Sequence, residues 1–198
     1  MTLRLDLDGE TDIPNDRIAA VVTYLEMREK PAAAPSGTVR LVPVERPGLD
    51  WYRDLYRAIG GEWLWTSRLR LSDEALAAIL HHPDVAVFSA EDDRGTIGIV
   101  ELDFRIAGEA EIVFFGLLRQ ATGQGLGGAM MTAALDEAWR PGVSRIWLHT
   151  CTLDHPAAVK FYRRQGFRPY RRAIEIFPDP RLAGIHPKDA APHAPVLG

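Results

Sequence analysis

Apolar and polar positions along this chain repeat with two different periods. Alternating apolar residues, or continuous runs rich in Val, Ile and Phe, predict β-strands, and apolar residues spaced near 3.6 positions apart predict helices. The predicted strands cover residues 38–44, 85–90, 96–104, 112–118, 145–150 and 172–177. The predicted helices cover residues 51–59, 72–81, 130–138 and 156–165. The order β, α, α, β, β, β, α, β, α, β indicates a mixed α/β fold in which helices cover a sheet.

Local signals mark the starts of two of these helices. Ser72 stands before two acidic residues, as expected for an N-cap and a first helical turn. Pro156 suits the first turn of the last helix, for which either Asp154 or His155 is the expected cap.

The two ends of the chain carry weaker patterns. Residues 3–7 read as a strand, and residues 18–25, IAAVVTYL, suit either a strand or a helix. The Val-Val-Thr-Tyr core of the second segment favours a strand. Prolines, a serine and a glycine within residues 31–37 predict a linker. The last 21 residues are rich in Pro and Ala without periodicity, so we expect them to be extended over the surface or disordered.

These patterns divide the chain into three parts. Residues 1–37 form an N-terminal extension and linker, with a strand that would add to the sheet or to a partner. Residues 38–177 form the main domain, and residues 178–198 form a C-terminal tail.

The stretch Glu111–Ala129, EIVFFGLLRQATGQGLGGA, joins a buried strand to a helix through four glycines. Glycines at a helix N-terminus leave backbone N–H groups uncovered and let a phosphate approach the positive end of the helix dipole. The stretch therefore predicts a site for a nucleotide-type diphosphate.

The order of elements and three motifs resemble the GCN5-related N-acetyltransferase (GNAT) superfamily over roughly residues 38–177. The family's pyrophosphate loop, Q/R-x-x-G-x-G/A, is similar to Thr122–Gly127, in which Thr122 stands at the Gln/Arg position. The motif N-x-x-A-x-x-x-Y-x-x-x-G-F is similar to His155–Phe167, with His155 at the Asn position. Ala110–Phe114 resembles a strand of the histone-acetylating members. The resemblance implies a mostly antiparallel central sheet with splayed central strands, flanked by helices.

A dinucleotide-binding fold is the rival interpretation, because Gly123, Gly125 and Gly128 also satisfy G-x-G-x-x-G. In that fold the glycines follow the strand almost directly, and further βα units come afterwards. Here residues 119–122 intervene, and little chain remains after Gly166. A kinase-type phosphate loop also fits poorly, since no Lys-Ser/Thr follows the glycines.

The resemblance implies direct transfer of an acetyl group from acetyl-CoA to a primary amine. The amine arrives as an ammonium ion with a pKa near ~10 and must lose a proton before it attacks. Glu111 occupies the family's base position, and Glu101 on the neighbouring strand is the second candidate. For either, the alternative is a solvated or ion-paired carboxylate. Tyr162 stands where the family keeps its general acid, and the alternative is a core tyrosine.

The resemblance also implies how acetyl-CoA is held. Backbone groups at the end of the strand would bond the pantetheine arm, and amides of the glycine loop would bind the diphosphate. The expected cofactor-binding residues are Leu117, Leu118, Thr122, Gly123, Gln124, Gly125, Leu126, Gly127, Gly128, Ala129, His155 and Tyr162. Arg163 or Arg164 would meet the ribose 3′-phosphate, unless they form a solvated helix face.

Other candidate residues have simpler interpretations. His149 and Cys151 end a predicted strand near the expected site, and they read as a satisfied core histidine and an inert buried thiol rather than as a nucleophilic pair. No metal site is expected, because His81 and His82 are adjacent on a helix and point in different directions. Four aromatic residues near the first helix either line an acceptor pocket or pack the core: Trp51, Tyr52, Trp63 and Trp65.

Composition limits the partners. A net charge of −4 argues against a general nucleic-acid binder. With no leader, no long apolar run and a single cysteine, a cytoplasmic protein without membrane contact is expected. We expect a small-molecule or peptide amine as acceptor, and leave its identity and the choice between monomer and homodimer open. A catalytically silent CoA-binding or protein-interaction module is the alternative function.

Overall fold

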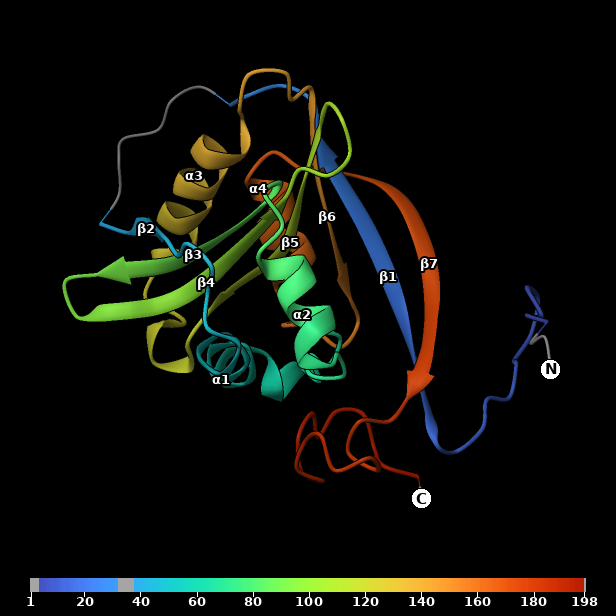
Figure 1. The fold of residues 1–198 in the computed structure, drawn as a ribbon. Helices are drawn as coiled ribbons and strands as arrows, with labels where there is room; N and C mark the ends of the chain where they lie inside the picture. The colour runs from blue at the N-terminus through green and yellow to red at the C-terminus, as the bar shows by residue number, and fades with distance from the viewer. Residues whose placement is uncertain (1–3, 32–37, 198) are drawn as a thin grey trace.

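Within residues 4–31 and 38–197, which the computed structural model describes, seven strands form one open sheet with the order β2-β3-β4-β5-β6-β1-β7 (Figure 1). The strands are β1 (Arg17–Met27), β2 (Arg40–Pro43), β3 (Val85–Asp92), β4 (Gly95–Asp103), β5 (Glu109–Leu117), β6 (Arg145–Cys151) and β7 (Arg168–Pro178). The helices are α1 (Leu49–Gly60), η1 (Gly61–Trp63), α2 (Asp73–Leu80), η2 (Arg119–Ala121), α3 (Leu126–Ala138) and α4 (Ala158–Arg164). This mixed, mostly antiparallel α/β architecture confirms the predicted fold class.

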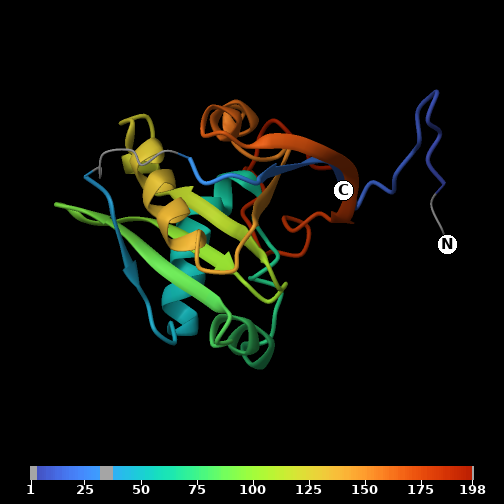
Figure 2. The same cartoon turned by 90° about the horizontal axis from the view of Figure 1, so that it is seen from above.

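Helices cover both faces of the sheet (Figures 1 and 2). α1 and α2 lie on one face, where Tyr52 and Leu76 are fully buried against Ile99 of β4. α3 lies on the other face, where Met130 is fully buried in a core that includes Val100. Because neighbouring strand residues point to opposite faces, consecutive residues of β4 serve both cores. Each fully buried side chain of this size contributes about 1.5–3 kcal/mol.

β5 and β6 run parallel and stay paired over only a short distance. The pairing joins Glu109–Glu111 of β5 to Arg145–Trp147 of β6 and ends there. The register between β4 and β5 shifts between Glu101 and Leu102, a bulge that bends the strand at this point. The two central strands therefore diverge, which confirms the predicted splay.

β1 lies between β6 and β7 and pairs antiparallel with both (Figure 1). The strand interpretation of residues 18–25 is confirmed. The C-terminal segment comprises residues 179–197, which follow β7. Ile18 is buried with residues of this segment, whereas Leu25 is buried in the core below α3, on the opposite face of the strand. The sequence IAAVVTYL shows no single alternation because its buried face changes along the strand. The division of the chain at residue 37 stays a prediction.

The C-terminal segment packs against the molecule, so the expectation that it is extended or disordered was wrong (Figure 1). Arg181 organises the segment with a side chain that is 1% exposed. It donates to the carboxylate of Asp179 at 2.7 Å and to the carbonyls of Ala190 and Ala194 at 2.9 and 2.7 Å. A buried arginine orders this segment through backbone carbonyls, which hydrophobic periodicity does not reveal.

The predicted helix starts have different outcomes. The Ser72 hydroxyl accepts a first-turn amide of α2 at 3.2 Å, as predicted. α4 begins after Pro156 with Ala157 at its N-cap and no side-chain cap, so the cap predicted there was wrong. The Asp154 carboxylate accepts instead from groups of β6 and from Trp65.

Residues 4–7 form no strand, so the strand predicted at residues 3–7 was wrong for the part that the structure describes. Residue 3 and linker residues 32–37 lie outside the described residues. Among the described helices, none has the length and apolar character needed to cross a membrane.

Candidate active site

The divergence of β5 and β6 opens a cleft of about 1330 Å³. Its walls come from β5, the segment after α1, the glycine loop, the end of β6 and α4. Nine of the residues predicted from the sequence line it: Leu117, Thr122, Gly123, Gly125, Leu126, Gly127, Gly128, His155 and Tyr162. Five predicted residues do not line it: Glu101, Glu111, Leu118, Gln124 and Ala129.

The glycine loop turns the chain into α3 at the cleft wall. Gly123 and Gly125 have φ values of +79° and +78°, in the left-handed region that favours glycine. Gly125 is the N-cap of α3, so the first-turn amides of Leu126–Gly128 have no acceptor within the helix. The positive end of the helix dipole therefore meets the cleft.

Two side chains of this loop already have hydrogen-bond partners. The hydroxyl of Thr122, at the Gln/Arg position of the motif, donates to the Leu118 carbonyl at 3.3 Å. The side-chain oxygen of Gln124 accepts from Arg94 at 3.0 Å. An anion at this loop would therefore meet backbone amides first.

The end of β5 presents alternate backbone groups to the cleft. The Leu118 amide donates to the Ile97 carbonyl at 2.8 Å, and the Leu118 carbonyl accepts from Ala121 at 2.8 Å. Because antiparallel partners alternate between bonded and non-bonded pairs, Leu117, opposite Gly98, points its N–H and C=O away from β4. Leu117 therefore offers free backbone groups to the gap, whereas those of Leu118 are occupied.

Tyr162 lies on α4 among aromatic rings. Its ring is 6.3 Å from that of Phe115 on β5, in an edge arrangement, and its side chain packs against the α3 core. Burial raises the pKa of the phenol, so the hydroxyl keeps its proton at neutral pH. Tyr162 thus has both features considered from the sequence: it packs against the core, and it faces the cleft.

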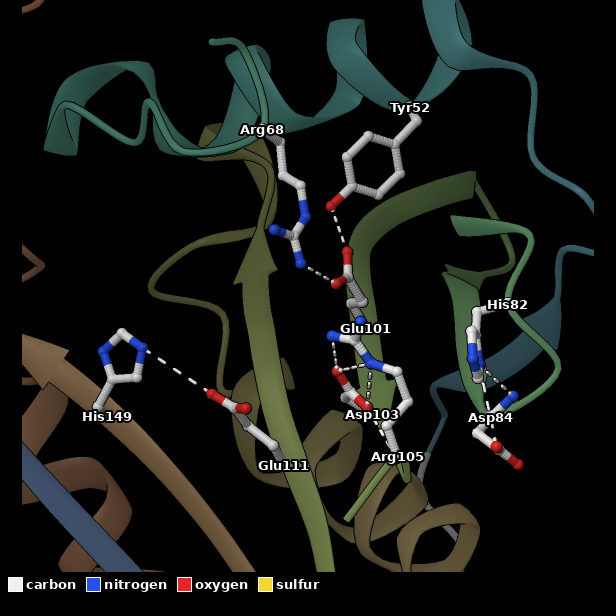
Figure 3. A network of polar contacts seen from close by, with 9 residues as sticks. All are labelled: Tyr52, Arg68, His82, Asp84, Glu101, Asp103, Arg105, Glu111 and His149. Carbon is white, nitrogen blue, oxygen red and sulfur yellow. Dashed lines mark hydrogen bonds and ion pairs between the residues drawn. The ribbon is translucent and has the colours of Figure 1, made fainter. Parts of the chain in front are cut away.

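Glu101 is fully buried between two donors (Figure 3). Its carboxylate accepts from the Tyr52 hydroxyl and from Arg68, the latter at 2.5 Å. Burial raises the pKa of Tyr52, and this hydroxyl stays protonated as a donor. A carboxylate held in this way is a structural ion pair beneath α1.

Glu111 lies at the closed end of the divergence, where β5 and β6 are still paired. It lines a second, smaller cavity of about 270 Å³ together with Asp103, Arg105, Glu109 and Trp147, among others. Burial, with a smaller effect of Asp103, raises the pKa of Glu111 to about 7. The Oε1 atom of Glu111 lies 3.9 Å from Nε2 of His149 (Figure 3).

His149 lines the main cleft, so its interpretation as a core histidine was wrong. Its side chain is 43% exposed. Partial burial between the cleft walls lowers the pKa of its imidazole, which favours the neutral ring at neutral pH. For Cys151, burial raises the pKa to about 11, so the side chain stays a thiol.

Sequence patterns missed Arg68, and they gave His149 no role in the cleft. Arg68 comes from the turn before α2 and lines the cleft while it holds Glu101. No periodicity or motif marks either residue. Both gain their place from the ends of elements that meet only in the folded chain.

The aromatic residues separate into two groups. Trp63 and Trp65 line the cleft, and the Trp65 indole donates to Asp154 at 2.9 Å across it. Trp51 is partly exposed and Tyr52 is buried at Glu101, so neither belongs to the cleft wall.

Two further predictions concern charged side chains. Arg164 lines the cleft and Arg163 does not. His81 bonds the Pro47 carbonyl, and His82 lies near Asp84. Within residues 4–31 and 38–197, no three His, Cys, Asp or Glu side chains are grouped to hold a metal ion.

Comparison with known families decides the relationship that the motifs indicated. A model of the acetyltransferase (GNAT) family matches residues 49–167, more than half of the chain. The chain belongs to the acetyltransferase (GNAT) family. The match includes β5, the glycine loop and α4, so the main elements of the cleft belong to the GNAT domain. A search of curated proteins found no match.

Solved structures share the GNAT fold at low sequence identity. A conserved protein of unknown function from Staphylococcus epidermidis has a TM-score of 0.57 at 17% identity, over 82% of this chain and 63% of its own. An acetyltransferase from Thermus thermophilus has a TM-score of 0.52 at 18% identity, over 72% and 98%. An aminoglycoside acetyltransferase from an uncultured soil metagenomic sample has a TM-score of 0.51 at 17% identity, over 64% and 86%. At these identities the comparisons establish the fold.

Proposed function

We propose that this GNAT protein is an N-acetyltransferase that moves the acetyl group of acetyl-CoA directly to a primary amine. One observation carries the proposal: a single cleft joins the free edge of β5, the open first turn of α3 and the Tyr162 side chain. These groups suit the three parts of the donor, which are the pantetheine arm, the diphosphate and the thioester.

The donor would lie between the diverging strands. Leu117 would pair its free N–H and C=O with the amide groups of pantetheine, as an added strand would. The amides of Leu126–Gly128 would bind the diphosphate. Arg164, on the cleft wall, is the stronger of the two candidates for the ribose 3′-phosphate. Leu118 is the weakest of the proposed contacts, because both its backbone groups are occupied.

The chemistry needs a base for the amine and an acid for the thiolate. Glu111 is the proposed base, since a pKa of about 7 leaves a large share of carboxylate at neutral pH. We do not propose Glu101, whose carboxylate is buried and doubly bonded. Tyr162 is the proposed acid: its raised pKa keeps the phenol proton until the CoA thiolate leaves.

Release of free thiol from acetyl-CoA tests the proposal across a panel of amines: amino acids, polyamines, lysine peptides, peptide N-termini and an aminoglycoside. Turnover on any of them supports it. Thermal stabilisation by CoA without turnover on any amine would favour the catalytically silent module instead.

A tyrosine variant tests the roles within the cleft. Tyr162→Phe should lower kcat about 10²-fold with CoA affinity unchanged, because it removes a proton donor and keeps the ring. Tyr170→Phe is the matched control, since Tyr170 lies on β7, outside the cleft wall. Equal kcat in both variants would reject Tyr162 as the acid. A cytoplasmic location, independence from metal and the oligomeric state stay predictions.

A further inference from the structure

The proposed base does not border the cleft in which the acceptor must lie. Glu111 lines the smaller cavity of about 270 Å³, whereas the residue on the cleft side is His149. An amine in the cleft would meet the imidazole before it met the carboxylate. Glu111 is therefore less well placed than His149 to take a proton directly from the amine.

His149 is placed by the end of the β5–β6 pairing. Trp147 is the last residue of β6 paired with β5, opposite Glu111. His149 is two residues further and therefore points to the same face as Trp147. The strands have begun to diverge there, so the imidazole reaches into the cleft while Nε2 stays 3.9 Å from Glu111 Oε1 (Figure 3).

The groups around the imidazole come from four elements. Glu111 faces it from β5, and the Tyr24 ring of β1 packs against it with centroids 5.5 Å apart. The charges of Glu175 on β7 and Asp154 after β6 act to raise the pKa of His149, against the larger effect of burial. A proton arriving on the ring is thus stabilised by carboxylates, although the resting ring is neutral.

Several charged groups surround Glu111. Burial raises its pKa most, and Asp103 and Glu101 raise it further, whereas Arg68 and Arg105 lower it. Asp103 and Arg105 are themselves paired. Glu111 can therefore take up a proton near neutral pH at the edge of a second cavity.

We propose that His149 is a catalytic residue that takes the proton from the acceptor ammonium and passes it to Glu111. This step rests on the proposed acetyl transfer. An N–H bond of the ammonium breaks as an N–H bond forms at Nδ1 of His149. The Nε2–H bond of the same ring breaks as an O–H bond forms on Glu111. The amine keeps its freed electron pair for attack on the thioester carbonyl.

The transfer requires the His149–Glu111 contact to shorten from 3.9 Å to about 3 Å, a common change between free and substrate-bound enzymes. Glu111 then releases the proton to solvent through the smaller cavity, and the ring returns to its first tautomer by exchange with solvent. The net change is the loss of one proton from the ammonium, with no change in the charge of the pair.

The kinetic test compares His149→Gln with His82→Gln in thiol-release assays on an active amine. His82 is a histidine beside Asp84, outside the cleft wall. His149→Gln should lower kcat about 10²-fold, and His82→Gln should not change it. Added imidazole should restore part of the activity of His149→Ala. Full activity of His149→Gln beside an impaired Glu111→Gln would overturn the relay and leave the acetyl transfer in place.

A titration tests the pair without any turnover. The imidazole shifts of His149, followed by NMR across pH, should show an inflection near pH 7 from ionisation of Glu111 in the wild-type protein, and this inflection should be absent in Glu111→Gln. An identical titration in both proteins would overturn the proposal. If no amine is acetylated, the proposed function fails, and this titration alone decides whether the two residues are coupled.

Discussion

His186 donates a hydrogen bond from Nε2 to the carbonyl of Trp65 at 2.8 Å. The contact joins the C-terminal segment to the wall of the cleft, between two residues that lie 121 positions apart in the sequence. Trp65 is also held by Asp154 through its indole. The C-terminal segment thus helps to set the position of an aromatic side chain that lines the cleft.

Arg181→Met should release the C-terminal segment. The change leaves the nearly buried Asp179 without its partner and leaves two carbonyls without a donor, at a cost of about 3–5 kcal/mol to docking of the segment. Hydrogen exchange should become faster in residues 182–197 while the sheet keeps its protection. Arg57→Met, which removes an exposed pair with Asp54, is the control. Unchanged exchange in the segment would contradict this account of its docking.

Glu111→Gln should change the pH dependence of stability. The folded-state pKa of about 7 exceeds the ordinary value of 4.5, so the folded protein binds more protons between these values and loses stability as pH rises through them. Over this window the loss amounts to about 3 kcal/mol. The variant lacks it, so its gain over wild type should be larger at pH 8 than at pH 5 in urea denaturation. An equal difference at both pH values would show that Glu111 has an ordinary pKa.

Gly125→Ala should weaken CoA binding as well as the fold. A side chain at φ +78° costs roughly 1–2 kcal/mol, and relief of this strain would turn the first-turn amides of α3. We expect CoA affinity to fall about tenfold, equivalent to about 1.4 kcal/mol, by calorimetry. Gly142→Ala is a matched control, with φ +91° and no atom within 4 Å of the added Cβ, outside the cleft wall. Similar CoA affinity in the two variants would argue against the loop as the diphosphate site.

Arg68→Met should destabilise the protein strongly, and adding Glu101→Gln should recover part of the loss. The single change leaves a fully buried carboxylate with only the Tyr52 hydroxyl as donor, at a cost of about 3–5 kcal/mol. The double change removes that uncompensated charge. Urea denaturation of the two variants measures the difference. A double variant no more stable than the single one would show that the Glu101 charge is not the source of the loss.

The elements and motifs were predictable because they depend on local patterns. Strand and helix periods indicated the order of the elements, and β1 and the splay of β5 and β6 agree with the predictions. The glycine loop was recognisable because left-handed turns and uncovered amides require glycine at fixed positions. Residues 4–7, the described part of the strand predicted at residues 3–7, form no strand because a short apolar alternation forms one only where a sheet edge receives it.

The partners of the charged residues were not predictable from local sequence. Two glutamates on neighbouring strands were both candidates for the base, but Glu101 is covered by Tyr52 and Arg68 whereas Glu111 opens to a cavity. Burial and partners of a side chain depend on segments that are distant in sequence, and no local period records them.

By itself, the sequence determined the mixed α/β fold, the GNAT resemblance and the glycine loop at the start of α3. The tertiary structure alone decided that β1 lies between β6 and β7, that the C-terminal segment docks through Arg181, and that His149 enters the cleft. The physical reason is that periodicity and turn chemistry act over a few residues, whereas packing, burial and ion pairing join residues far apart in the chain.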